Sequence, residues 1–200
     1  MFYWTAHTFL RILRFFCFPM KVYGREHIPS RENYIIASNH QSNLDPVLLG
    51  ISILNRALNY FAKDSLFKNR VLGTLIRWGG AFPVKRGKGD VWALKEAVRR
   101  LKSKGPLVMF PEGTRKRGDD EQEAYPGIGF LATKAGVPIV PAYIDGSDKV
   151  MPPGVKWPRR HLITITYGAP LYFSPGTDYD QIAREVMRHI RDIPRFAVSG

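Results

Sequence analysis

The sequence predicts a single α/β domain in which a mostly parallel central sheet is flanked by helices. Three observations indicate this fold class. Short apolar, β-branched runs alternate along the chain with segments of helical periodicity, which is the pattern of β-α-β units. The 200 residues are about the length of one domain, and 44% of them are hydrophobic, which suffices for one core. No internal repeat or low-complexity tract interrupts the pattern.

The expected elements follow one another in a regular order. Strands are predicted at residues 21–24, 34–38, 60–63, 81–84, 107–110, 137–144 and 161–167. Between them, Asp45 and Pro46 make a helix start, with Asp45 as N-cap and Pro46 at the first helical position. A second helix should reach about Trp78, and Asp90 should cap a third one that stops at Gly105. Two more helices are expected at residues 127–135 and 179–193.

The first twenty residues predict a separate element, an amphipathic helix that associates with a membrane. Large apolar and aromatic side chains dominate this segment, and Arg11 and Arg14 interrupt it. The run is too short and too charged to cross a bilayer, which takes roughly 18 or more apolar residues. Trp and Tyr beside Arg suit the headgroup boundary, where such a helix lies flat. The alternative is an ordinary helix packed on the domain core.

The charge of the chain indicates an anionic partner. Lys and Arg number 30 against 17 Asp and Glu, a net charge of +13, and most of the excess falls between Arg56 and Lys104. A membrane surface, a phosphorylated substrate and nucleic acid all fit this balance. Cys17 is the only cysteine, so neither an internal disulfide nor a Cys-rich zinc site is expected, and a reducing compartment fits best. The histidine spacing predicts no metal site either.

The first candidate for chemistry is the segment NHQSNLDP, at the turn between a predicted buried strand and a helix. His40 is suited to act as a general base, and Asp45, five residues on, could fix its tautomer and stabilise its charged form. The simpler interpretation is that Asp45 only caps the helix. Ser38 and Ser42 lie nearby, but neither stands in the Gly-x-Ser-x-Gly motif of α/β hydrolases.

The second candidate is the segment FPEGTR, which follows another predicted buried strand. Gly113 allows a ligand to approach the backbone, Thr114 offers a hydroxyl, and Arg115 offers a planar fork for phosphate. Upstream, Lys85 and Arg86 follow a Gly-containing turn and add two cations. Taken singly, each segment could also be a turn with solvated charges.

Together and in this order, these segments resemble the phospholipid/glycerol acyltransferase family, and most of all its bacterial 1-acyl-glycerol-3-phosphate acyltransferases. NHQSNLDP is similar to the family's His-x₄-Asp motif, and FPEGTR is similar to its phosphate-binding motif. The blocks at residues 63–73 and 137–141 resemble two others, so the likeness covers about residues 22–168. It implies that residues 21–200 form an acyltransferase domain, with residues 1–20 as its membrane anchor.

The resemblance also implies a reaction and a site. An acyl group would pass from acyl-CoA or acyl-carrier protein to the sn-2 hydroxyl of lysophosphatidic acid, giving phosphatidic acid, with no cofactor or metal. The alternative acceptor is another lysolipid or a glycerol phosphate. His40 would be the general base and Asp45 the residue that orients it. The implied substrate-binding residues are Lys63, Arg86, Glu112, Gly113, Thr114 and Arg115.

Three positions depart from the family pattern. Arg70 stands where Pro is usual, and Tyr125 and Phe130 stand where cations are common. The loss of two cations weakens the case for lysophosphatidic acid as the acceptor, but leaves the case for acyl transfer.

Two other classes of function remain as alternatives. A nucleic-acid-binding module would explain the charge, but the aromatic residues cluster at the N-terminus and no RNP-type or helix-turn-helix motif is present. A non-catalytic lipid-binding protein would not need the pair of His40 and Asp45. We therefore expect a peripheral or monotopic enzyme on the cytoplasmic face of the cell membrane, with no nucleic-acid partner.

Overall fold

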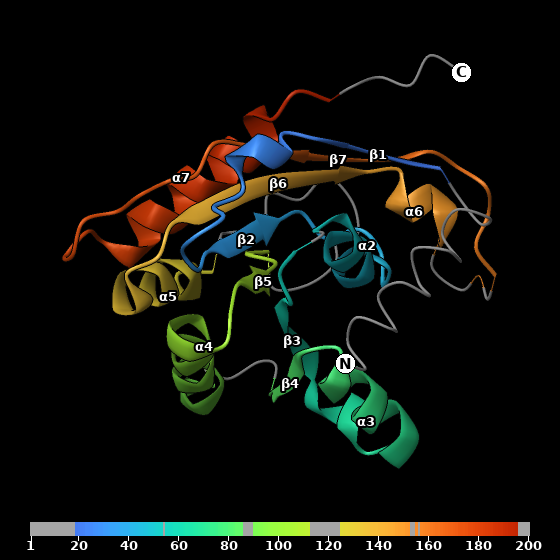
Figure 1. Cartoon of the computed structure of the whole chain (residues 1–200), viewed down its shortest axis with the longest axis horizontal. Coiled ribbons are helices and arrows are strands. Elements are labelled where there is room, and N and C mark those ends of the chain that lie inside the picture. Colours follow the sequence, from blue (N-terminus) through green and yellow to red (C-terminus); the bar gives the residue numbers. More distant parts are fainter. Residues whose placement is uncertain are drawn as a thin grey trace.

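The computed structural model describes residues 19–53, 55–85, 90–112, 125–152, 155 and 157–195. A seven-stranded sheet runs through this part of the chain in the order β1-β7-β6-β2-β5-β3-β4 (Figure 1). Neighbouring strands are parallel, except for the antiparallel pair β6 and β7. The strands are β1 (Met20–Tyr23), β2 (Ile35–Ser38), β3 (Asn59–Lys63), β4 (Ala81–Val84), β5 (Leu107–Met109), β6 (Ile139–Asp145) and β7 (Ile163–Tyr167).

Helices cover both faces of this sheet. They are α2 (Asp45–Ser52), α3 (Arg70–Trp78), α4 (Val91–Ser103), α5 (Gly127–Ala135), α6 (Ser147–Val150) and α7 (Tyr179–Asp192), with 3-10 turns η1 (Arg25–His27) and η2 (Asp64–Phe67). The connections through α2 and α3 lead from β2 to β3 and on to the edge strand β4. The connections through α4 and α5 lead back from β4 to β5 and then to β6. Because crossovers between parallel strands are right-handed, α2 and α3 lie on one side of the sheet and α4 and α5 on the other (Figure 1). The C-terminal helix α7 packs on the same side as α4 and α5.

The core is split into two layers by the sheet. The central strand β2 is buried on both faces, because its alternating side chains reach both layers. Ile36 packs with Leu48 of α2 on one face, and Ile35 packs with residues of α4, α5 and α7 on the other. A parallel strand covered on both faces is expected to be continuously apolar, as residues 34–37 are.

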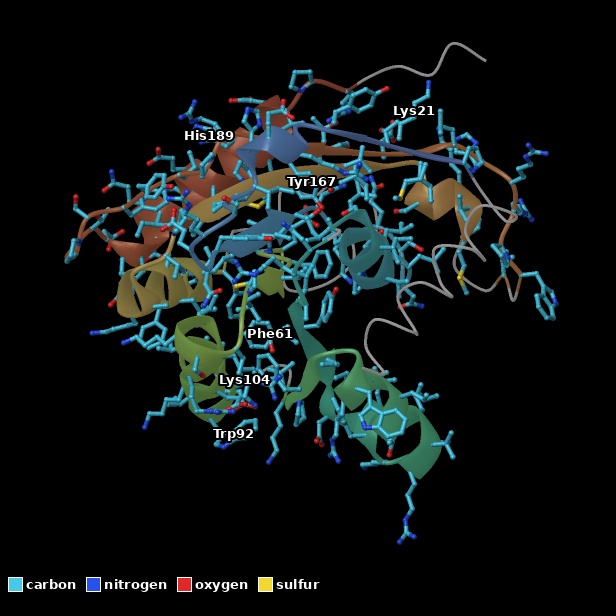
Figure 2. All side chains as sticks on the ribbon, viewed as in Figure 1. Lys21, Phe61, Trp92, Lys104, Tyr167 and His189 are labelled. Carbon is cyan, nitrogen blue, oxygen red and sulfur yellow. The ribbon has the colours of Figure 1, made fainter. Side chains whose placement is uncertain are left out.

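A buried pair of hydroxyl groups joins α2 to β7. Tyr167, at the end of β7, lies inside the molecule, and its hydroxyl is 2.5 Å from the Ser52 hydroxyl (Figure 2). Burial raises the pKa of the Tyr167 phenol, so it stays neutral across the physiological range. This contact fixes the carboxyl end of α2, and Asp45 lies at the amino end of the same helix.

The structure confirms the predicted strands to within a few residues, as well as the mostly parallel sheet. One local prediction was confirmed in part: the predicted helix ends at Trp78, but it begins only at Arg70, after the 3-10 turn η2, because Asn69 accepts a hydrogen bond from the Leu72 backbone N–H and caps α3. A second local prediction was wrong. Asp45 does not cap α2: Leu44 holds the N-cap position with no side-chain cap.

The predicted N-terminal helix lies outside the described residues, apart from Pro19 and Met20, and Met20 begins β1. Within the described residues, none of the helices is both long enough and apolar enough to span a bilayer.

Candidate active site

The predicted site residues gather at one edge of the sheet because of its topology. Strands β2, β5, β3 and β4 are mutually parallel neighbours, so the segments that follow their carboxyl ends meet at the same edge. His40 follows β2 and Glu112 follows β5, and the register pairs Ala37 with Met109 just before them. Lys63 ends β3, and Lys85 follows β4. This is the edge where open parallel sheets bind their ligands.

A buried hydrogen-bonded pair lies at the centre of this edge. His40 Nδ1 is 2.9 Å from Asp45 Oδ2, and the two side chains are 10% and 0% exposed. With Asp45 as a carboxylate, Nδ1 must donate the hydrogen, which leaves the lone pair on Nε2. Among the described residues, His40 Nε2 has no hydrogen-bond partner. Asp45 therefore orients the imidazole, and in the neutral ring Nε2 is its basic nitrogen.

The same carboxylate shapes the turn that carries the histidine. Asp45 Oδ2 also accepts hydrogen bonds from the backbone N–H groups of Gln41, at 2.7 Å, and Ser42, at 2.8 Å. Asp45 therefore sits inside the first turn of α2 and reaches back over the loop, instead of capping the helix from outside. This explains why the capping prediction failed and why the five-residue spacing still places the carboxylate against His40.

Two further residues hold His40, and neither was predicted. The ring of Phe110, just after β5, stacks on the imidazole with 4.1 Å between centroids and 19° between planes. The Asn39 amide pairs with the backbone of Ile144 on β6, accepting from its N–H at 2.7 Å and donating to its C=O at 2.8 Å. Asn39 thereby continues the pairing of β2 with β6 for one residue past the strand end, directly before the histidine.

Of the remaining predicted residues, the structure describes Lys63 and Glu112 only. Lys63 is exposed, and Glu112 is buried on the same edge. Burial raises the pKa of the Tyr143 phenol on β6, and the charge of Glu112 is a smaller contribution in the same direction. Within the described ranges, no three His, Cys, Asp or Glu side chains come together as metal ligands. Arg86, Gly113, Thr114 and Arg115 lie outside the described residues.

The fold and the oriented imidazole together define the class: an α/β enzyme with a His–Asp pair at the carboxyl edge of its sheet. The family is shown by sequence. The Acyltransferase family model matches residues 19–145, so the chain belongs to the acyltransferase family and is an O-acyltransferase.

Similar proteins carry a more specific name. A 1-acyl-sn-glycerol-3-phosphate acyltransferase of Bacillus subtilis is 29% identical, over 76% of this chain and 74% of its own length. The enzyme of that name from Streptococcus pneumoniae is 34% identical over 62% of this chain and 46% of its own. The crystal structure of a 1-acyl-sn-glycerophosphate acyltransferase from Thermotoga maritima superposes with a TM-score of 0.73, at 25% identity, over 96% of this chain and 79% of that one.

Proposed function

We propose that this acyltransferase moves a fatty acyl group from a thioester donor, acyl-CoA or acyl-carrier protein, to the sn-2 hydroxyl of 1-acyl-glycerol 3-phosphate. The product is phosphatidic acid, a precursor of phospholipids. One observation carries the proposal: the buried hydrogen bond of 2.9 Å between His40 Nδ1 and Asp45 Oδ2, at the ligand-binding edge of the sheet. The names of the similar proteins support the choice of acceptor.

In this mechanism His40 is the general base. Its Nε2 removes the proton of the acceptor hydroxyl as the oxygen attacks the thioester carbonyl carbon. Asp45 keeps Nδ1 protonated and stabilises the imidazolium that forms. When the tetrahedral intermediate collapses, the C–S bond breaks and the thiolate takes the proton from His40. The reaction then balances without an acyl-enzyme and without a cofactor.

The phosphate of the acceptor requires cations at the same edge. Arg115 and Arg86 are suited to bind it through paired N–H groups, and Lys63 adds a charge where β3 ends. Gly113 and Thr114 would contribute backbone and hydroxyl donors. Glu112, which is buried, would position this loop.

The chemistry of the two substrates indicates where in the cell the enzyme acts. A lysophospholipid resides in the bilayer, so the enzyme must reach an anionic membrane surface, and a CoA or carrier-protein thioester places it on the cytoplasmic face. The net charge of +13 favours that surface. Nucleic acid has no part in the proposal. Because Tyr125 and Phe130 replace common cations of the family, a related lysolipid or glycerol phosphate is the alternative acceptor.

An assay of thioester consumption with a panel of acceptors tests the proposal. We expect turnover with lysophosphatidic acid, less with lysolipids that lack a terminal phosphate, and little with glycerol 3-phosphate. His40→Ala should lower kcat about 10²- to 10⁴-fold, the usual range for a general base. The matched control is His189→Ala, because the His189 imidazole bonds only to the Glu185 carbonyl among the described residues of α7. Equal turnover by His40→Ala and His189→Ala would refute the role of His40.

A further inference from the structure

The helix α3 turns its apolar side away from the protein. Amphipathic helices ordinarily bury their apolar stripe against the core. In α3 the large apolar side chains are instead exposed: Val71 by 72%, Leu75 by 48% and Trp78 by 51%. These three lie at helical spacings of four and three residues, so they form one continuous stripe, and Leu72, 41% exposed, widens it. We call these four residues the outer stripe.

The side of α3 that faces the protein is already filled. Gly73 is the only fully buried residue of the helix. A Cβ at that position would lie 3.0 Å from the Phe67 carbonyl oxygen, so the helix and the preceding turn are in backbone contact. The Arg77 guanidinium stacks over the Phe67 ring at 5.1 Å. The outer stripe therefore has no place in this domain's core, and an exposed apolar patch of this kind marks an interaction surface.

The charges around the outer stripe select the kind of partner. Arg70 and Arg77 belong to α3 itself, and Lys68 precedes it, whereas the helix contains no acidic residue. Trp78 ends the helix, and an indole beside an arginine suits the boundary between headgroups and acyl chains. This chemistry complements an anionic bilayer.

The position of α3 connects this surface to the reaction. The helix lies at the periphery of the molecule beside the edge strand β4 (Figure 1). The segment η2–α3 begins directly after Lys63, at the carboxyl end of β3. A bilayer that touched the beginning of α3, at Val71, would thus lie on the side of the sheet edge that carries His40, whereas Trp78 leads into the amino end of β4.

We propose that the outer stripe of α3 inserts into the interface of an anionic membrane and sets how the active-site edge meets the lipid surface. This inference rests on the proposed function, because a lipid acceptor must enter the active site from a bilayer. It assigns the contact to a helix from the middle of the sequence, Arg70–Trp78, in addition to any contact made by the predicted N-terminal anchor.

Fluorescence of a single tryptophan tests this contact without any measurement of activity. In the full chain, Trp4, Trp92 and Trp157 are replaced by Phe, so that only Trp78 reports. Vesicles of phosphatidylcholine and phosphatidylglycerol carry brominated acyl chains as quenchers. We expect the emission of Trp78 to shift to the blue and to be quenched when the protein binds. Unchanged emission while the protein floats with the vesicles would overturn the proposal.

A matched control places the single tryptophan beside β6, which β2, β5 and β3 separate from β4. Tyr172 is 66% exposed and follows Leu171, which bridges to Ile139 at the start of β6. Tyr172→Trp, with all four native tryptophans replaced by Phe, should show no quenching. Quenching of equal strength at both positions would also contradict the proposal, because it would mean that the protein has no preferred orientation on the vesicle.

A second measurement uses binding strength. Leu75→Gln should weaken vesicle partitioning about tenfold, the factor that corresponds to burial of one leucine side chain. Tyr172→Gln should leave it unchanged. If Leu75→Gln instead dissociates a dimer in solution and leaves vesicle binding intact, the stripe is an interface between copies of the chain and the proposal fails. Quenching without acyl transfer would refute the proposed function alone, and acyl transfer without quenching would refute the docking surface alone.

Discussion

Replacement of Asn39 by Ala should impair both folding and catalysis, because this amide joins the histidine loop to β6. The substitution removes the two hydrogen bonds, of 2.7 and 2.8 Å, to the Ile144 backbone. Ile144 is completely buried, so its N–H and C=O would lose their partners without gaining water. Each buried group left unsatisfied costs about 1–3 kcal/mol. The free energy of unfolding should therefore fall by about 2–6 kcal/mol.

The catalytic loss should exceed what instability explains. Asn39 directly precedes His40, and a catalytic group displaced by about 1 Å can lose about 10²-fold in rate. We expect kcat of Asn39→Ala to fall by about that factor at a temperature where the variant is fully folded, with little change in the acceptor KM. Urea unfolding gives the stability, and steady-state thioester consumption gives kcat and KM.

Asn59 provides the matched control. It is also a buried asparagine whose amide donates to two backbone carbonyls, those of Gly105 and Pro106, but it lies at the amino end of β3, on the opposite edge. Asn59→Ala should lose comparable stability and keep its kcat. The reasoning is refuted if Asn39→Ala loses less than about 1 kcal/mol, or if the two variants have the same kcat.

Two further predictions concern stability. Hydrogen bonds from Arg99, and to a smaller extent from Arg100, lower the pKa of Glu96 from its ordinary 4.5 to about 2. The stability that the Glu96 carboxylate contributes is present above pH 4.5 and is lost as the pH falls toward 2. In urea unfolding at pH 7, the free energy of unfolding of wild type should therefore exceed that of Glu96→Gln by about 1 kcal/mol. A difference of the same size at pH 2 would contradict this prediction. Gly80 has a φ of 90°, and an added Cβ would lie 2.1 Å from the Leu58 carbonyl oxygen. Gly136 has a φ of 67°, but its added Cβ would meet open space, so Gly136→Ala should cost only the backbone strain of about 1 kcal/mol. Gly80→Ala should therefore destabilise the protein much more than Gly136→Ala. Equal losses in thermal unfolding would mean that the contact with Leu58 relaxes without cost.

The parts of the fold that could be predicted are those with a local signal. The run at residues 34–37 is apolar at every position, so a strand buried on both faces was the natural interpretation. The pairing of His40 with Asp45 could be predicted as well, because five residues around a tight turn bring two side chains together. The structure differs from this prediction only in the position of the carboxylate, because Asp45 reaches the imidazole from inside the first turn of α2 and not from the N-cap.

The contacts that could not be predicted join distant parts of the chain. Asn39 binds Ile144, 105 residues away, and the partner is determined only when β6 takes its place beside β2. Phe110 meets His40 for the same reason, since β5 is the other neighbour of β2. The sequence indicated a helix that ends at Trp78, but an apolar stripe ordinarily predicts the buried side of a helix, and in α3 that stripe is exposed.

The coupling between His40 and Asp45 in catalysis tests the central claim most directly. Acyl transfer from a thioester to lysophosphatidic acid is measured for His40→Ala, for Asp45→Asn and for the double variant, with urea unfolding to establish that each is folded. If Asp45 acts through His40, the double variant should be no slower than His40→Ala, because the loss of the base already removes the effect of its partner. Multiplication of the two single losses in the double variant, or full activity of His40→Ala, would contradict the account.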